Sequence, residues 1–349
     1  MPEAYIVDAI RTPTGKRRGS LAEVHGADLG AHVLRAIVER NAIPDVDYDD
    51  VMFGCLDAIG PLAGDIARTC WLAAGLSDEV PGTTIDRQCG SSQQAVHFAA
   101  QAVMAGVNDV VVAGGVQTMS KIPISAAMIA AQPLGFSDPF SGSQGWRARY
   151  GDVQVSQFNS AQMIADKWKI SREQMEAFAL ESHTRALRAI AEGRFDREIV
   201  PMEQLAMDET PRHTSMEKMA SLEPLAEGGT ITAGVSSQTC DGASAMLIVS
   251  EDALKRYNLT PRARIAHMSV RAEDPHYPGR STDSIASYNP TNGTESLGNI
   301  FQYGGDPFWI GVVMSSVNRT VYATSSGSLD RTLDVDGVHY LHRLPPPLK

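Results

Sequence analysis

Basic residues, cysteines and long apolar runs are all scarce in this 349-residue sequence. The 30 lysines and arginines are outnumbered by 41 aspartates and glutamates, which leaves a formal net charge of −11 at pH 7. Proteins that bind nucleic acids or anionic membranes usually carry a positively charged surface, because they must displace counterions or bind anionic lipid headgroups. The charge therefore argues against partners of either kind, and a polyanionic ligand would need a local group of basic residues.

The four cysteines are sparse and unevenly spaced, at Cys55, Cys70, Cys89 and Cys240. They contain no Cys-x-x-Cys pair, so the spacing indicates neither a disulfide framework nor a zinc site. We therefore expect reduced thiols and no bound metal.

No apolar run approaches the roughly 18 residues that a membrane-spanning helix requires. The first five residues, MPEAY, also lack the basic and apolar regions of a signal peptide. The sequence therefore predicts a cytoplasmic protein without membrane association. An apolar content of 43% and the length of the chain are sufficient for a large core divided among more than one domain.

Strand-like and helix-like segments alternate over the first part of the chain. Short β-rich runs alternate with segments whose apolar residues recur at helical spacing. Such alternation implies right-handed crossovers and a mostly parallel sheet buried between helices, which is an α/β fold. The strands are expected at 4–9, 51–54, 83–86 and 109–113, and the helices at 28–40, 65–74 and 92–104.

The alternation of strands and helices stops after residue 120. In the segment that follows, helices are expected at 160–168 and 172–191, with few strands. The alternation resumes with strands at 245–250 and 264–270 around a short helix at 251–257. From His276 onward, polar residues dominate and helical periodicity disappears. The predicted organisation is an amino-terminal α/β core at 1–120, an inserted helical loop domain at 121–229, a return to the core sheet at 230–275 and a divergent tail at 276–349.

The densest chemical signal is segment 86–95, DRQCGSSQQA, which places Cys89 on a tight turn between a strand and a helix. Unpaired N–H groups and the positive end of the dipole at a helix start favour a thiolate, so the pKa of Cys89 should fall. Gly90 lets the backbone bend sharply and a thioester approach closely. A thiolate suits acyl transfer between two thioesters. The alternative, a small buried cysteine without reactivity, is left open by spacing alone.

Several segments, in order, resemble motifs of the thiolase family. The turn around Cys89 resembles the family's nucleophile turn, and the resemblance extends from Met1 to about Pro275. It is carried by RTPTGK at 11–16, IAR at 66–68, GGVQTMS at 114–120, ISRE at 170–173, GRF at 193–195, GTITAGVSS at 229–237 and DGA at 241–243. The form of the cysteine turn is most similar to actinobacterial members tied to lipid or sterol side-chain degradation.

The resemblance implies a thiolase-like layered fold and an acyl-CoA acyltransferase. Such an enzyme cleaves 3-ketoacyl-CoA with CoA, or runs the reverse condensation, through an acyl thioester on Cys89. Ser237 falls on the serine that meets the pantetheine arm, and Gly234 lies in the same motif. Gln157 lies among residues that replace a common His-Met-Gly, in the loop domain that forms much of the CoA surface. Coenzyme A is then a substrate with no bound cofactor, and a homodimer or homotetramer is expected, paired through the edge of the amino-terminal sheet.

The sequence also departs from the family pattern. Gln117 replaces a common glutamate, Val235 replaces an asparagine, and Asp65 stands where an asparagine is usual. The family's Asn-Glu-Ala-Phe, Gly-His-Pro and Cys-x-Gly-Gly-Gly motifs, which supply its general base and its second acid/base cysteine, do not occur. Glycines do not follow Cys240, and the tail histidines, His276, His339 and His342, lack the motif.

Two alternatives to an active thiolase therefore stand. One is a truncated, catalytically impaired thiolase-like protein that binds CoA or a partner. The other is a condensing enzyme like the β-ketoacyl synthases, which the Thr-Ala-Gly motif and the loop-domain matches disfavour.

Overall fold

The computed structural model describes residues 2–153, 155–268 and 270, and the backbone of short strands further along the chain. These strands form three antiparallel pairs. They are β8 (Ser287–Asn289) with β9 (Thr294–Ser296), β10 (Gly311–Met314) with β11 (Val321–Thr324), and β12 (Thr332–Val335) with β13 (Val338–Leu341). The rest of the predicted tail, including His276 and His342, lies outside the described residues.

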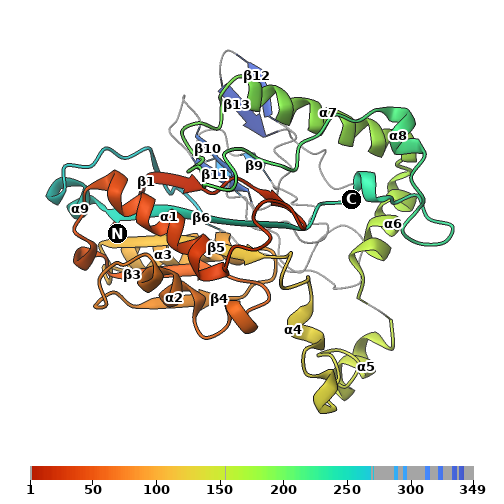
Figure 1. Cartoon of the computed structure of the whole chain (residues 1–349), viewed down its shortest axis with the longest axis horizontal. Coiled ribbons are helices and arrows are strands. Elements are labelled where there is room, and N and C mark those ends of the chain that lie inside the picture. Colours follow the sequence, from red (N-terminus) through yellow and green to blue (C-terminus); the bar gives the residue numbers. More distant parts are fainter. Residues whose placement is uncertain are drawn as a thin grey trace.

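A single mixed sheet forms the centre of the described protein (Figure 1). Its strand order is β4 (Gly82–Ile85), β3 (Asp50–Gly54), β5 (Val110–Thr118), β6 (Cys240–Ser250), β1 (Ala4–Arg11) and β7 (Ala263–Arg264), with β2 (Gly15–Lys16) beside β6. β3 is parallel to β4 and β5, while β6 is antiparallel to both β5 and β1. Strands β4, β3, β5 and β1 therefore run in one direction, which confirms the predicted, mostly parallel α/β sheet.

Helices cover both faces of this sheet. Helices α1 (Gly26–Asn41) and α2 (Ile66–Ala73) pack on one face, and α3 (Ser91–Met104) packs on the other. Alternation along a strand decides which face each side chain meets. Along β5, Val112 belongs to the cluster with α1 and α2, whereas its neighbour Val111 belongs to the cluster with α3. The described residues also contain four short 3₁₀ turns, Asp45–Asp47, Gly60–Leu62, Gln132–Leu134 and Ala233–Val235.

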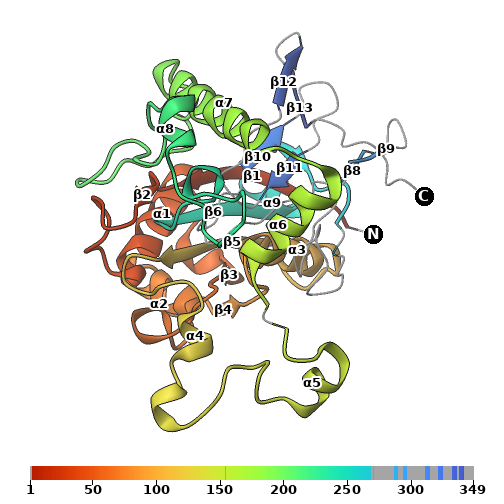
Figure 2. The ribbon, with the colours of Figure 1, turned by 90° about the vertical axis from the view of Figure 1, so that its right-hand side faces the viewer.

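The segment between β5 and β6 leaves the sheet, and we call residues 119–239 the excursion. Its long helices, α6 (Gln157–Trp168) and α7 (Arg172–Ala191), are the two expected from the sequence. Three shorter helices were not predicted, because four to seven residues show no helical periodicity: α4 (Ala126–Ile129), α5 (Gln144–Tyr150) and α8 (Met216–Ala220). In both views α4 and α5 extend away from the sheet (Figures 1 and 2).

After β6 the prediction is partly wrong. The short helix α9 (Glu251–Arg256) is present, but the strand expected at 264–270 ends at Arg264 after two paired residues. Beyond it, the side chains of Ile265 and Met268 pack into the cluster under α3. The apolar residues that suggested a strand therefore cover a helix. In the described part of the chain, no helix is both long and apolar enough to cross a bilayer.

Candidate active site

Cys89 occupies the turn that joins β4 to α3. β4 ends at Ile85, α3 begins at Ser91, and the Cys89 residue is 9% exposed. β4 is hydrogen-bonded to β3, and α3 packs on the face of the same sheet. A side chain at Gly54, the last residue of β3, would lie 2.8 Å from the Cβ of Ser91 and closer still to the helix backbone. Glycine at this position therefore lets the first turn of α3 rest directly on the sheet.

The start of α3 directs partial positive charge toward the cysteine. Gly90 caps the helix without any side-chain hydrogen bond, so no side chain of the cap residue neutralises the first turn. The N–H of Gln94 donates to the carbonyl of Gly90 at 2.9 Å, which begins the helical ladder directly after Cys89. The positive end of the helix dipole favours an anion at such a position, and here the adjacent group is the Cys89 thiol.

The other cysteines have different surroundings. Cys55 and Cys70 are fully buried and Cys240 is 1% exposed. Burial, with a smaller contribution from Asp57 and Asp86, raises the pKa of the Cys55 thiol to about 12. Burial also raises the pKa of Cys70. Both thiols are therefore neutral and unreactive at physiological pH, and the position of Cys89 at a helix start distinguishes it from them.

Gln117 ties the end of β5 to the loop after β3. Its side-chain oxygen accepts hydrogen bonds from the Leu56 N–H at 3.3 Å and from the Cys55 thiol, with a sulfur–oxygen distance of 3.7 Å. Gln117 is only 1% exposed. A carboxylate buried here would carry a large desolvation cost, whereas the neutral amide leaves its Nε2 without a hydrogen-bond partner among the described residues.

Ser237 and Cys89 lie at the same edge of the sheet. Ser237 comes three residues before β6, which is antiparallel to β5 and so begins beside the end of β5. Cys89 follows the end of β4, and β4 is parallel to β3 and β5 in direction. Three inter-strand steps separate β4 from β6, which is about 14 Å. Cys89 and Ser237 therefore lie at the same end of the strands, with β3 and β5 between them.

Gly234 lies in a 3₁₀ turn (Ala233–Val235) at the end of the excursion. Its N–H donates to the Oγ1 of Thr232 at 3.2 Å, and a Cβ at this position would lie 2.8 Å from Leu222 Cδ1. A side chain here would therefore have to displace the end of the Leu222 side chain. Gln157 is the first residue of α6, and this helix is joined to the same loop by Gln162, whose side-chain oxygen accepts from the Thr230 N–H at 2.7 Å.

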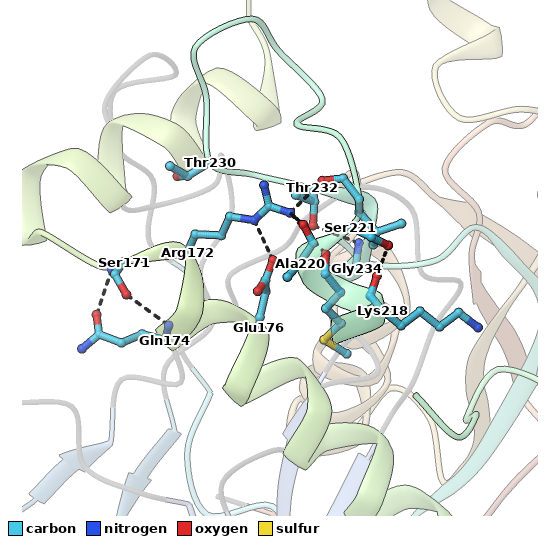
Figure 3. A network of polar contacts seen from close by, with 12 residues as sticks. Ser171, Arg172, Gln174, Glu176, Lys218, Ala220, Ser221, Thr230, Thr232 and Gly234 are labelled. Carbon is cyan, nitrogen blue, oxygen red and sulfur yellow. Dashed lines mark hydrogen bonds and ion pairs between the residues drawn. The ribbon is translucent and has the colours of Figure 1, made fainter. Parts of the chain in front are cut away.

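A polar network holds α7 to α8 beside this loop (Figure 3). The Arg172 guanidinium donates to Glu176 at 2.6 Å and to three backbone carbonyls, those of Met219, Ala220 and Leu222, at 3.2, 3.0 and 2.7 Å. Glu176 is 2% exposed. These contacts use the Nε and Nη2 of Arg172, which gives this side chain a structural role between α7 and α8.

A cavity of about 310 Å³ lies between α7 and residues 212–214. The N–H of Arg212 donates to the Nδ1 of His183 at 3.4 Å, and burial, with Arg212 beside it, lowers the pKa of His183. The cavity lining combines two leucines and two threonines with two histidines and two arginines: Leu180, His183, Thr184, Leu187, Arg188, Arg212, His213 and Thr214. It is a local basic group on an acidic protein.

This basic cavity was not found from the sequence. Its lining residues come from two segments, 180–188 in α7 and 212–214 in the loop before α8. Only the fold brings these two segments together. The helical segment left a signal, because Leu180, His183, Thr184 and Leu187 recur at the spacing of one helix face. Among the described residues, no group of three or more His, Cys, Asp or Glu side chains is arranged to hold a metal ion.

Comparison with known proteins gives consistent matches. The family model described as "Thiolase, N-terminal domain" matches residues 4–252. A steroid 3-ketoacyl-CoA thiolase of Mycobacterium tuberculosis, FadA6, is 54% identical over 279 residues, which are 79% of this chain and 69% of that protein. The 3-oxoadipyl-CoA/3-oxo-5,6-dehydrosuberyl-CoA thiolase of Escherichia coli K12 is 38% identical over 297 residues, 80% of this chain and 74% of that protein.

A solved structure agrees with the fold. The crystal structure of the Bacillus anthracis acetyl-CoA acetyltransferase superposes with a TM-score of 0.67 at 33% sequence identity, covering 79% of this chain and 72% of that one.

Proposed function

Because the chain belongs to the thiolase family and is an acyl-CoA acyltransferase of thiolase type, we propose that it cleaves 3-ketoacyl-CoA with CoA, or runs the reverse condensation, through an acyl thioester on Cys89. The position of Cys89 between β4 and the start of α3 is the observation that carries this proposal. The other three cysteines have almost no exposure, and burial makes two of them poor nucleophiles.

The reaction has two halves. In the first, the Cys89 sulfur bonds to the 3-keto carbon of the substrate and the bond between carbons 2 and 3 breaks. The electron pair leaves on the enolate of acetyl-CoA, which then takes a proton. In the second half, the CoA sulfur attacks the acyl group, and the Cys89 thiol is regenerated. The nucleophile of this scheme is assigned to Cys89; the proton carriers are assigned to no residue of this chain.

The substrate-binding residues belong to the excursion and its return to the sheet. Ser237 and Gly234 lie in the loop before β6, at the sheet edge where Cys89 also lies, which suits a pantetheine arm reaching from the loop to the thiol. Gln157 on α6 is proposed to contact the acyl group. The basic cavity with Arg188 and Arg212 supplies the positive charge that CoA phosphates require, on a protein whose net charge is −11.

We also propose a homodimer formed through β4. In the described sheet β4 pairs with β3 alone, so its other edge offers unpaired backbone groups. A second copy can pair β4 against β4 around a two-fold axis, which gives a closed assembly. Light scattering should give twice the 37.5 kDa mass of the chain. A single 37.5 kDa species would refute the dimer without bearing on Cys89.

Incubation with acetoacetyl-CoA and CoA tests the activity. We expect the enolate absorbance to fall in wild-type protein and to persist with Cys89→Ser, while the control Cys240→Ser keeps the activity. Intact-mass analysis without CoA should find an acetyl group on Cys89. An adduct without turnover would limit the protein to the first half-reaction. Neither adduct nor turnover, in folded protein that still binds CoA, would favour a thiolase-like CoA-binding protein.

Substrate size is a separate question. The 54% identical relative is named for steroid 3-ketoacyl-CoA. We therefore propose that this chain also accepts a bulky cyclic 3-ketoacyl-CoA, and the same assay with such a thioester, compared with acetoacetyl-CoA by kcat/KM, tests this. No turnover of such a thioester, by protein that cleaves acetoacetyl-CoA, would refute it.

A further inference from the structure

The turn that carries Cys89 is held in an uncommon backbone conformation. Gln88, the residue immediately before the cysteine, has φ of +48°. A side chain in this left-handed region is disfavoured by about 1 kcal/mol or more and persists where neighbouring contacts hold it. The N–H of Gly90 donates to the carbonyl of Arg87 at 3.0 Å, and the N–H of Ser91 donates to the carbonyl of Gln88 at 3.1 Å. These backbone bonds close the turn around Cys89.

The hydroxyl of Ser91 adds two further bonds across the same turn. It accepts from the backbone N–H of Arg87 at 2.8 Å and donates to the backbone carbonyl of Gln88. Ser91 is fully buried. One side chain on the first residue of α3 thus fixes the 86–87 and 88–89 peptide groups, on either side of the peptide between Arg87 and Gln88.

The Asp86 carboxylate holds the other side of the strained residue, because its Oδ1 accepts from the Gln88 N–H at 2.8 Å. Gln88 is therefore held through its N–H by Asp86 and through its carbonyl by Ser91. Its dihedral angles decide the direction in which the next residue, Cys89, presents its sulfur to the start of α3.

The neighbouring serine provides an internal comparison. Ser92 is as buried as Ser91, yet its Oγ has no hydrogen-bond partner in the part of the chain that the structure describes. Both residues belong to the first turn of α3 and differ by one position. We call the two hydrogen bonds of the Ser91 hydroxyl, to Arg87 and to Gln88, the Ser91 clamp. Burial of a serine in the first turn of α3 is not enough to form such bonds, because Ser92 is equally buried and makes none of them.

We propose that Ser91 is a positioning residue for the thiolase-type reaction, whose hydroxyl holds the left-handed Gln88 and thereby aims the Cys89 sulfur at the positive end of α3. The inference rests on the proposed function, in which Cys89 is the nucleophile. Without the hydroxyl, Gln88 relaxes toward φ below zero, the sulfur moves away from the helix start, and the thiolate loses its stabilisation.

Iodoacetamide labelling of Cys89 against pH, followed by peptide mass analysis, tests the clamp without any acyl-CoA. We expect Ser91→Ala to slow labelling at neutral pH by about tenfold, as for the loss of one to two hydrogen bonds, and to shift the labelling profile to higher pH. Ser92→Ala should label within about twofold of wild type, since that hydroxyl makes no bond to the turn. Ser91→Thr, which keeps the hydroxyl, should restore most of the rate.

A second variant covers the case in which Ser91→Ala fails to fold. Gln88→Gly removes the penalty of the left-handed backbone and keeps the bonds from Asp86 and Ser91, so its thermal midpoint should not fall and Cys89 should label at about the wild-type rate. Adding Ser91→Ala to Gln88→Gly removes the hydroxyl from a turn that carries no strain, so the double variant should fold and should label more slowly than Gln88→Gly alone. Equal labelling of Gln88→Gly and the double variant, or an equal slowing in Ser91→Ala and Ser92→Ala, would overturn the proposal. Absence of an acetyl adduct in wild type, with the clamp variants still slowing the label, would refute the proposed function alone.

Discussion

All nine residues of β5 and all eleven of β6 are buried, whereas in the 20 residues of α7 the one buried residue is Glu176. The sheet with α1, α2 and α3 is held by apolar contacts on both faces. The excursion is held by helix caps, by the Arg172 network and by the Gln162–Thr230 bonds. Cys89 is attached to the apolar region, and the proposed Gly234 and Gln157 contacts are attached to the polar one.

This difference matches two separate requirements, which are to hold a nucleophile in place and to bind and release a substrate. A nucleophile must be held to within a fraction of an ångström, which a close-packed core provides. A surface that admits and releases a long thioester substrate can be built from elements of lower local stability. Four predictions measure how far the two regions differ.

The largest effect is expected in the core. Phe53 on β3 is fully buried, so Phe53→Ala should lower the free energy of unfolding by about 3–5 kcal/mol, through lost transfer energy and the cavity left behind. Phe136 in the excursion is 65% exposed, and Phe136→Ala should change it by less than about 0.5 kcal/mol. Urea denaturation followed by circular dichroism measures both. Equal losses would mean that the excursion is packed like the core.

The next effect depends on pH. His97 on α3 is 6% exposed, and burial, with Arg87 and His267 nearby, lowers its pKa to about 4. Because the folded value lies below the unfolded one of about 6.5, the neutral ring stabilises the fold above pH 6.5, and this stabilisation disappears as pH falls toward 4. It amounts to at most about 3 kcal/mol, at about 1.4 kcal/mol per pKa unit. In His97→Gln, stability should fall less steeply over this window, and an unchanged slope would contradict the assignment.

A smaller effect is expected from the polar network of the excursion. Arg172→Met leaves the buried Glu176 carboxylate without its cation and should cost about 2–3 kcal/mol, less than a fully buried pair because Arg172 is partly exposed. Amide exchange should accelerate in α7 and α8 but not in β5. The matched control is Arg185→Met, whose partner Glu181 is 54% exposed, and it should change stability by less than about 0.5 kcal/mol. Faster exchange in β5 would show that the two regions are coupled.

The smallest effect is a gain. Gly145 lies in α5, and a Cβ there meets no atom within 4 Å. Gly145→Ala should therefore raise the unfolding free energy by about 0.5–1 kcal/mol, through a less flexible unfolded chain and a better helix former. Gly135 in the same excursion has φ of +86°, so Gly135→Ala should lower it by about 1 kcal/mol. A lower unfolding free energy in both variants would contradict the open space that surrounds Gly145 in α5.

Much of the core was predictable because its signals are local. The helix expected at 28–40 is α1 (Gly26–Asn41), and the apolar residues at helical spacing along it, Leu29, Val33 and Ile37, are all buried. The strand predicted at 264–270 failed because periodicity does not tell a strand from an extended segment that packs beneath a helix. Ile265 does the latter.

The candidate site was predictable only in part. The turn that places Cys89 between a strand and a helix was predicted from the sequence pattern, and the structure has it. The role of Cys89 as nucleophile, like the roles of Ser237, Gly234 and Gln157, came from resemblance to a family and stays a prediction. The Ser91 clamp and the basic cavity needed the fold. The first depends on the φ of Gln88, and the second depends on residues 29 positions apart at His183 and Arg212.

The central claim is that Cys89 carries a reactive thiolate because it lies at the start of α3. The rate at which iodoacetamide labels each cysteine of the wild-type protein at neutral pH measures this directly. The account predicts that Cys89 is labelled faster than a free peptide thiol while Cys55, Cys70 and Cys240 stay unlabelled in the folded protein. Labelling of Cys89 at or below the rate of the free peptide thiol would contradict it.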